Sequence, residues 1–233
     1  MGAPADAAPR PDLEIVGLLP RSTNNALLVR VGEGDDAAYA VYKPQAGERP
    51  LWDFPEGTLC LREVAASAVA EELGWPRIPR TTLVEGPFGP GALAEFVPFE
   101  PAEHFFTLRD AHADAMRRIA AFDVVANNAD RKGGHCLLAE DGGIVSIDHG
   151  LCFHEEPKLR TVIWDYVGDA LPDDVAADLR RLGGALDGAL GERLAALLTP
   201  DEIAATRERL RALLAEGRFP EPRWEPAVPW PPV

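Results

Sequence analysis

The chain has 233 residues, 46% of them hydrophobic, which is enough for one large domain or two lobes that share a core. Its 23 basic and 38 acidic residues give a net charge of −15 with no local basic patch, so nucleic-acid phosphates and anionic lipid headgroups would repel it. Three cysteines do not make a secreted disulfide framework, the N-terminus lacks the pattern of a signal peptide, and no apolar run approaches the roughly 18–20 residues of a membrane span. We therefore expect a cytoplasmic protein that binds no nucleic acid and has no integral membrane contact.

The N-terminal part is predicted to be an antiparallel sheet with one helix. Apolar runs separated by turn residues predict strands at 13–20, 25–32 and 37–44. A helix over 58–75 follows, with apolar residues near helical spacing and Gly74 as its stop. Around the turn "GPFGPG", two more strands are predicted at 80–86 and 91–98.

The character of the sequence changes after Pro98. One long helix is predicted over 108–128, followed by a short hairpin over 136–148 that turns at Asp141-Gly142-Gly143. The remainder is predicted to be helical. Its last helix, 199–217, begins with a capping box formed by Thr199 and Glu202 and is closed by Gly217.

The order of the elements indicates an α+β fold with two lobes and a tail at each end. In chain order these are a disordered tail rich in Ala and Pro, a sheet lobe with one main helix, a mostly helical lobe with the hairpin, and a Pro-rich tail, at residues 1–12, 13–98, 99–218 and 219–233. A short connection at 95–99 joins the lobes. The six prolines after Phe219 predict an extended segment, although its Trp224 and Trp230 could dock on the body.

Lys43 and Glu63 form the first candidate pair for chemistry. A lysine at a strand end is often only solvated, and a glutamate early in a helix is often a surface charge favoured by the helix dipole. Together they indicate more, because a helix glutamate that pairs with a strand lysine can hold that lysine on the phosphates of a nucleotide.

Asp130 and Asp148 form the second candidate pair. Either could be ordinary turn chemistry beside glycine. However, Asp130 enters the predicted hairpin in "NNADRKGGH" and Asp148 leaves it in "SIDHG", so the two carboxylates should lie at one edge. Two carboxylates placed there can hold a divalent cation and orient a nucleophile.

In this order, Lys43 in "VYKP", Glu63 in "REVAAS", the stretch "NNADRKGGH" and the stretch "IDHGLCF" resemble the atypical kinases of the phosphatidylinositol 3-/4-kinase superfamily. The type II phosphatidylinositol 4-kinases have the nearest pattern, and HipA-type Ser/Thr kinases share it more loosely. The chain also resembles an actinobacterial family of kinase-like proteins. The resemblance spans residues 13–165 and implies a protein-kinase-like two-lobed fold that uses ATP with Mg²⁺ or Mn²⁺.

The resemblance also implies roles for individual residues on the nucleotide side. Lys43 would contact the α- and β-phosphates of ATP, with Glu63 bracing it. The backbone of the connection would contact adenine, through Glu95, Phe96 and Val97. The turn between the first two strands would cover the phosphates; it lacks glycine, so binding there would depend on backbone N–H groups and on the side chains of Ser22, Thr23 and Asn24.

On the acceptor side, Asp130 would be the catalytic-loop acid near the acceptor hydroxyl, with Arg131 as its charge partner and Asn128 buttressing the loop. Asp148 would hold Mg²⁺ on the phosphates. One position departs from the family pattern, because His135 stands where the family has a metal-binding Asn. An imidazole suits Mn²⁺ better than Mg²⁺, or it could bond only within the loop.

The sequence predicts an ATP-dependent phosphotransferase with an alcohol acceptor. Because the chain is acidic, a protein or a small polar molecule is favoured as the acceptor over a membrane lipid. The sequence does not name the acceptor. One alternative is a nucleotide-binding pseudokinase that acts through a partner, which His135 and the glycine-free turn favour. Another is a zinc site among His135, Cys136, His149, Cys152 and His154, whose spacings are not typical of structural zinc.

Overall fold

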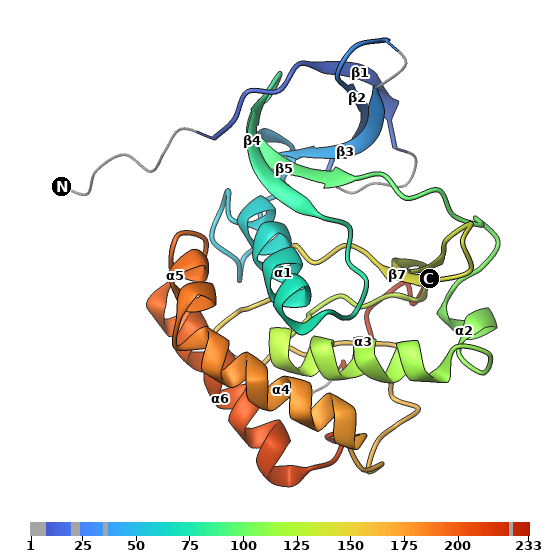
Figure 1. Ribbon diagram of the computed structural model, residues 1–233, viewed down its shortest axis with the longest axis vertical. Helices are drawn as coiled ribbons and strands as arrows, with labels where there is room; N and C mark the ends of the chain where they lie inside the picture. The colour runs from blue at the N-terminus through green and yellow to red at the C-terminus, as the bar shows by residue number, and fades with distance from the viewer. Residues whose placement is uncertain (1–7, 20–23, 35–36, 224–225) are drawn as a thin grey trace.

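The computed structural model describes residues 8–19, 24–34, 37–223 and 226–233, arranged as a sheet lobe above a helical lobe (Figure 1). Five antiparallel strands form the sheet in the order β1-β2-β3-β5-β4. All five predicted strands are present, although β5 both begins and ends earlier than predicted. The strands are β1 (Leu13–Leu18), β2 (Leu27–Val31), β3 (Ala38–Pro44), β4 (Thr81–Gly86) and β5 (Gly89–Glu95).

Tyr42 determines how closely β4 and β5 approach β3. Its side chain is fully buried, and its hydroxyl donates a hydrogen bond of 2.6 Å to the Gly89 carbonyl. A Cβ atom at Gly86 or at Gly91 would lie 2.6 Å from the Tyr42 ring. The absence of a side chain at these two glycines therefore provides the space that the Tyr42 ring occupies in the sheet core.

Helix α1 (Leu59–Leu73) lies between the sheet and the helical lobe (Figure 1). It contacts β4 and β5 on one side and two C-terminal helices, α4 and α5, on the other. Almost every residue of α1 is buried for this reason, and its alanines allow the close approach. The helix ends as predicted at Gly74, whose φ of 79° is left-handed.

The helical lobe contains the largest apolar core. The helix predicted over 108–128 is interrupted, with turns at residues 109–112, because Phe105 and Leu108 are buried in the same core and the chain bends to bring both pieces onto it. The capping box of the last helix is confirmed, since Thr199 Oγ1 and Glu202 N–H bond at 3.3 Å. The helices are α2 (Phe105–Leu108), α3 (Ala113–Ala126), α4 (Asp173–Leu186), α5 (Ala189–Ala195) and α6 (Pro200–Glu216), with short 3-10 turns η2 (Gln45–Gly47) and η3 (Gly133–His135).

The predicted hairpin is confirmed as β6 (Cys136–Leu138) paired with β7 (Ile144–Ser146). Its turn contains Gly142 with a φ of 82°, a conformation that glycine adopts without strain. The Ser146 N–H donates to the Arg77 carbonyl at 2.8 Å, which attaches the hairpin to the segment after α1. No helix among the described residues is long and apolar enough to cross a membrane.

The C-terminal segment lies against the helical lobe and reaches the loop before β6. The Ala227 carbonyl accepts hydrogen bonds from the Thr161 N–H and the Trp164 ring N–H, both at 3.1 Å. The Pro232 carbonyl accepts one from the Gly133 N–H at 2.7 Å. Trp230 does not dock, since it is 89% exposed, and Trp224 lies outside the described residues.

Deleting residues 226–233 should lower the free energy of unfolding by about 1–3 kcal/mol, because Thr161 and Gly133 lose their backbone acceptors. Urea unfolding followed by tryptophan fluorescence measures this change. Replacing the exposed Trp230 with Ala is the matched control and should leave stability unchanged. A deletion as stable as the native chain would show that the segment contributes nothing to the fold.

Candidate active site

Lys43 lies at the centre of a cluster of charges between the two lobes. Side chains alternate along β3, so Tyr42 enters the sheet core while Lys43 points to the opposite face. There its ammonium contacts the Glu63 carboxylate, supplied by α1, and Asp148 Oδ1 at 3.2 Å. The predicted pair is therefore formed, and Asp148, 105 residues along the chain, joins it.

The three charges shift one another's pKa values. Burial lowers the pKa of Lys43, but the carboxylates of Asp148 and Glu63 outweigh burial and leave it above its ordinary value. The Lys43 ammonium holds the pKa of Asp148 well below its usual range. Burial raises the pKa of Glu63, and Lys43 offsets only part of that effect. At neutral pH the lysine is a cation and Asp148 is an anion.

His135 contacts the other oxygen of Asp148. Its Nε2 atom lies 3.3 Å from Asp148 Oδ2, and its Nδ1 atom accepts a hydrogen bond of 3.4 Å from the Lys132 N–H. Burial lowers the pKa of His135 to about 4, so the ring is neutral at pH 7. Since Nδ1 accepts, Nε2 bears the proton and donates to Asp148. This is the loop bonding expected of His135 if it is not a metal ligand; a ligand role would need the other tautomer.

Asp130 bonds to a lysine that the sequence reasoning missed. Lys132 Nζ lies 2.8 Å from Asp130 Oδ2, and burial raises the pKa of Asp130 despite that contact. The signal for Lys132 is its position two residues after Asp130, on the same side of a tight loop. The Asp130 N–H donates to Asn128 Oδ1 at 2.9 Å, as expected of a side chain that buttresses the loop.

Arg131 has a different charge partner from the predicted one. Its fully buried guanidinium donates two hydrogen bonds of 2.9 Å to Asp123 of α3 and a third of 2.9 Å to the Ile147 carbonyl. Asp123 also accepts from Asn128 Nδ2 at 3.0 Å. The side chain points into the core, so Arg131 anchors the loop that carries Asp130 from its buried side.

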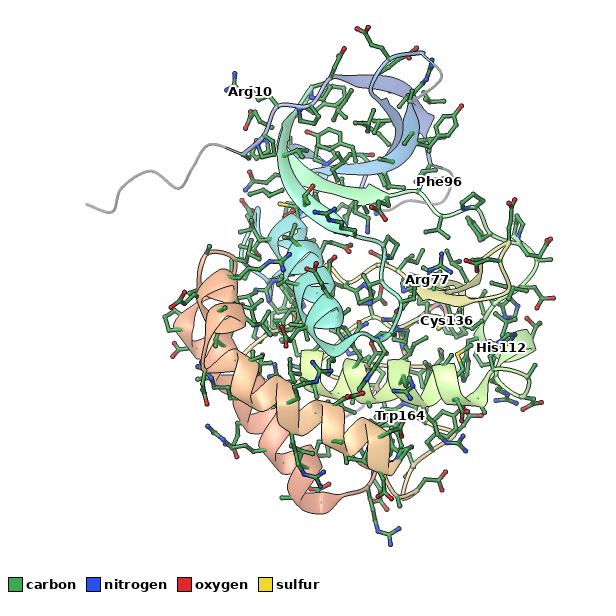
Figure 2. The ribbon with its side chains drawn as sticks, in the orientation of Figure 1. Arg10, Arg77, Phe96, His112, Cys136 and Trp164 are labelled. Atoms are coloured by element: carbon green, nitrogen blue, oxygen red, sulfur yellow. The ribbon has the colours of Figure 1, made fainter. Side chains whose placement is uncertain are left out.

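The connection after β5 is the segment expected to contact adenine, and Phe96 marks where it leaves the sheet (Figure 2). The Phe96 N–H donates to the Tyr39 carbonyl at 3.2 Å and the Glu95 N–H to the Arg80 carbonyl at 3.0 Å. Among the described residues no backbone carbonyl accepts a hydrogen bond from the Val97 N–H. Strand pairing places small apolar side chains on the face that carries Lys43, at Leu28, Val41 and Ala94.

Two of the three predicted phosphate-turn residues, Ser22 and Thr23, lie outside the described residues. The third, Asn24, uses its side-chain oxygen to accept a hydrogen bond of 3.3 Å from the Arg49 N–H. This bond joins the turn to the segment after β3.

The donor set suits a metal ion that arrives with a nucleotide. The Asp148 side chain is 44% exposed, so its carboxylate is open to the space between the lobes. Mg²⁺ is commonly held by one or two carboxylates together with phosphate oxygens and water, without an all-protein cage. No group of three or more His, Cys, Asp or Glu side chains able to hold a metal occurs in the described part of the chain. His154 instead bonds the Asp53 carbonyl at 2.8 Å, and the predicted zinc alternative gains no support.

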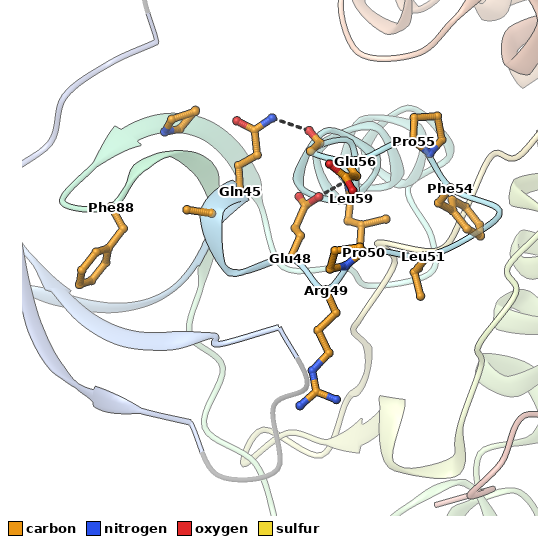
Figure 3. Close-up of a pocket in the computed structure, with 13 residues that line it drawn as sticks. Gln45, Glu48, Arg49, Pro50, Leu51, Phe54, Pro55, Glu56, Leu59 and Phe88 are labelled. Atoms are coloured by element: carbon orange, nitrogen blue, oxygen red, sulfur yellow. Dashed lines mark hydrogen bonds between the residues drawn. The ribbon is translucent and has the colours of Figure 1, made fainter.

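A separate hollow of about 400 Å³ lies beside the N-terminal end of α1 (Figure 3). Its walls come from residues 45–59 and the β4–β5 turn, and none of the charged cluster lines it. The Glu48 carboxylate accepts the Leu59 and Cys60 N–H groups at 3.2 and 2.8 Å, so the helix end is already capped. We therefore assign this hollow no role in the chemistry.

Comparison with known proteins places this geometry in a family. The sequence pattern described as "Phosphatidylinositol 3- and 4-kinase" matches residues 64–175. Protein Rv2133c of Mycobacterium tuberculosis is 37% identical over 255 residues, covering 94% of this chain and 92% of that protein. Phosphatidylinositol 4-kinase gamma 4 of Arabidopsis thaliana is 27% identical over 187 residues, covering 70% of this chain and 29% of that protein. The chain belongs to the phosphatidylinositol 3-/4-kinase-like family of atypical kinases.

The proinflammatory kinase CtkA of Helicobacter pylori shares the fold of this kinase-like chain. The two structures superpose with a TM-score of 0.52 at 10% identity, over 90% of this chain and 93% of that one. This likeness confirms the predicted α+β two-lobed fold. The family match includes Asp130 and Asp148 but begins after Lys43 and Glu63, so the assignment of that pair depends on the contacts described above.

The ligand role that the sequence resemblance implies for His135 requires its ring to change tautomer; if it does so when metal–ATP binds, His135→Asn should shift the metal preference of turnover from Mn²⁺ toward Mg²⁺, because an amide oxygen is a harder ligand than an imidazole nitrogen. Turnover measured with each metal alone, in the native and variant proteins, gives the ratio. His154→Asn is the control, since His154 bonds away from Asp148. Identical ratios in the native protein and His135→Asn would leave His135 as a loop residue only.

Proposed function

We propose that this chain is an ATP-dependent phosphotransferase that binds metal–ATP between the sheet and the helical lobe. The observation that carries the proposal is the Lys43 ammonium between the carboxylates of Glu63 and Asp148. A lysine held in this way presents a fixed positive charge to phosphate oxygens, as phosphoryl transfer requires.

The residues of the cluster divide the work between nucleotide and acceptor. Lys43 binds the α- and β-phosphates and Glu63 orients it, while the Val97 N–H is the group on the connection that remains to bind adenine. Asp148 would hold the divalent cation, which, when bound, neutralises charge on the phosphates. The acceptor hydroxyl oxygen forms the new bond to the γ-phosphorus, the bond from that phosphorus to the β-phosphate oxygen breaks, and Asp130 receives the hydroxyl proton.

Asp130 is suited to that proton transfer. Burial raises its pKa, which makes the carboxylate a better base than an exposed aspartate. Lys132 at 2.8 Å keeps it ionised before the reaction and is placed to approach the transferred group. Asn128 and Arg131 hold the loop from inside the core, so that Asp130 keeps its position.

Asp148→Asn should lower metal-dependent ATP turnover by on the order of 100-fold or more, because it removes the charge that would hold the cation. The fold should persist, since the side chain is 44% exposed. Asp141→Asn is a matched control on the same hairpin, where Asp141 pairs with Arg77 at 2.7 Å in the open. Steady-state turnover and thermal melting should be measured on all three proteins. Unchanged turnover in Asp148→Asn would contradict the proposal.

A second candidate function is a nucleotide-binding pseudokinase. The specific observation in its favour is that the His135 Nε2–H group is directed at Asp148 Oδ2, 3.3 Å away, at the position where the family has a metal-binding Asn. Metal-dependent thermal stabilisation by ATP without any transfer of label would favour this candidate over the enzyme.

We further propose that the acceptor is a protein or a small polar molecule. The net charge of −15 disfavours approach to an anionic membrane, where basic residues normally provide attraction. The name of the Arabidopsis relative points instead to phosphatidylinositol.

Binding to lipid vesicles and phosphorylation of the lipid in them distinguish a lipid acceptor from a protein or small polar one. We expect no co-sedimentation with phosphatidylserine-containing liposomes and no phosphorylation of phosphatidylinositol in them, under conditions where radiolabel from ATP reaches protein or water-soluble acceptors. A type II phosphatidylinositol 4-kinase serves as the positive control for the lipid assay. Clear phosphorylation of the lipid by this chain would overturn the assignment of the acceptor.

A further inference from the structure

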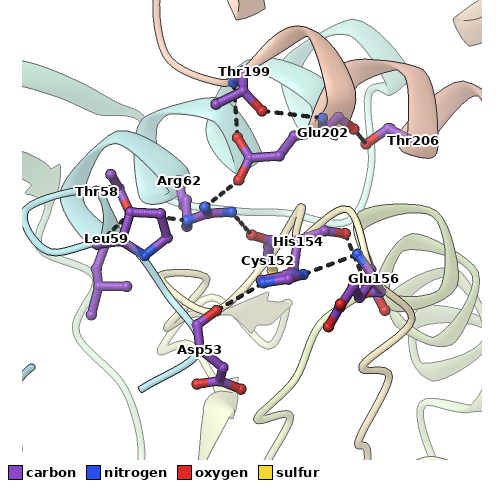
Figure 4. Close-up of polar contacts among 12 residues, drawn as sticks. Asp53, Thr58, Leu59, Arg62, Cys152, His154, Glu156, Thr199, Glu202 and Thr206 are labelled. Carbon is purple, nitrogen blue, oxygen red and sulfur yellow. Dashed lines mark hydrogen bonds and ion pairs between the residues drawn. The ribbon is translucent and has the colours of Figure 1, made fainter. Parts of the chain in front are cut away.

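Arg62, the neighbour of Glu63 in α1, is a buried cation with an unusual set of contacts (Figure 4). Its guanidinium donates to the Cys152 carbonyl at 2.7 Å and pairs with the Glu202 carboxylate. A weaker bond of 3.4 Å reaches Thr58 Oγ1, and the Phe54 ring centroid lies 4.9 Å from the guanidinium carbon. With 1% of its surface exposed, Arg62 therefore joins three parts of the chain: α1, α6 and the segment after Asp148.

Glu202 is itself fixed in place. Its second carboxylate oxygen accepts the Thr199 N–H at 2.8 Å and so completes the capping box of α6. The acceptor offered to Arg62 thus belongs to the rigid first turn of a helix in the C-terminal lobe. Arg62 connects α1 to a fixed point on that lobe.

The segment 148–152 is attached to α1 at both of its ends. At its start, Asp148 Oδ1 lies 3.2 Å from the Lys43 ammonium, which also contacts Glu63 of α1, and at the far end the Cys152 carbonyl accepts from Arg62. Between them the chain lies flush on the helix, since a Cβ added to Gly150 would be 3.5 Å from Leu59 Cβ. Two consecutive helix residues therefore hold the segment that carries Asp148.

Net stability does not account for this arrangement. Replacing a buried ion pair with apolar side chains of similar volume is often neutral or stabilising, so the pair is weak evidence for a stabilising role. What the pair determines is geometry. Successive side chains on a helix point about 100° apart, so a contact that fixes Arg62 toward α6 also fixes the direction of Glu63 toward Lys43.

We infer that Arg62 is a positioning residue, which fixes the rotation of α1 and the seat of segment 148–152 so that Glu63 and Asp148 hold Lys43 without a partner or a modification. The catalytic consequence depends on the proposed phosphotransferase function. The geometric consequence, a lysine gripped by two carboxylates in the chain alone, does not.

The test is a double variant, Arg62→Met with Glu202→Gln. It removes both buried charges together, and the Gln side chain can still cap α6. The first measurement is the rate at which an amine-reactive acylating reagent modifies Lys43 in the nucleotide-free protein, followed by mass spectrometry at one pH. We expect modification about tenfold faster than in the native protein, within the range of effects known for residues that orient a site. Thermal melting should show a folded protein.

Two further variants sharpen the result. Arg62→Lys keeps a charge opposite Glu202 but lacks the planar fork that also reaches the Cys152 carbonyl, so its labelling rate should be intermediate. Arg209→Met is the matched control. Arg209 lies on α6, like Glu202, and donates to the Val125 carbonyl at 2.9 Å and the His154 carbonyl at 3.1 Å; none of its hydrogen bonds reaches α1, so the Lys43 labelling rate should stay at the native value.

A folded double variant whose Lys43 is modified at the native rate would overturn the inference; if that variant fails to fold, a native rate in Arg62→Lys would do the same. Turnover provides the second measurement, with kcat for ATP expected to fall about 10–100-fold and KM to change much less. If the native protein turns over no ATP while the double variant still exposes Lys43, Arg62 positions the cluster and only the proposed function is wrong.

Discussion

The position of one ammonium group determines how the two lobes of this protein meet. Lys43 comes from the sheet, Glu63 from α1 and Asp148 from the helical lobe, and the three side chains contact one another between them. Burial alone lowers the pKa of Lys43 and so disfavours its charged form. The carboxylates keep the charge, and the charge in turn holds together elements that are far apart in sequence.

The position of the loop that carries Asp130 depends on a second ion pair, which is fully buried. Arg131 and Asp123 are both fully buried and satisfy each other with two hydrogen bonds, and Asn128 bonds to the same aspartate. The loop is therefore attached to α3 from inside, while Asp130 and Lys132 are left on the side that faces the space between the lobes. Buried residues that hold the loop, Asn128 and Arg131, therefore alternate in sequence with Asp130 and Lys132, which are partly exposed.

Much of this could be predicted from the sequence, because it depends on local patterns. The five strands, α1 with its stop at Gly74, the hairpin turn at Gly142 and the capping box at Thr199 all follow from periodicity and from residues with a specific backbone preference. Candidate site residues were found in the same way, through loops and strand ends that carry charge beside glycine.

What could not be predicted depends on contacts between distant segments. The family resemblance implies Arg131 as the charge partner of Asp130, but neighbours in a loop point in different directions, and Arg131 instead pairs with Asp123 on α3. The sequence leaves open that the extended tail docks through its tryptophans, but Trp230 is exposed and backbone carbonyls make the contacts. Arg62 showed no signal at all, since its acceptors lie 90 and 140 residues away.

The burial of α1 has a consequence for how the spacing of the two lobes could diverge among relatives. Ala65, Ala66 and Ala68 expose at most 1% of their surface, and the helix acts as a spacer between the sheet and the helical lobe. In an interior packed as densely as a crystal, each added methylene must displace a neighbour. The volume of the α1 side chains therefore sets the separation of Lys43 from the helical lobe. Small changes in that volume are a route by which selection could increase or decrease the separation of the lobes without altering any charged residue.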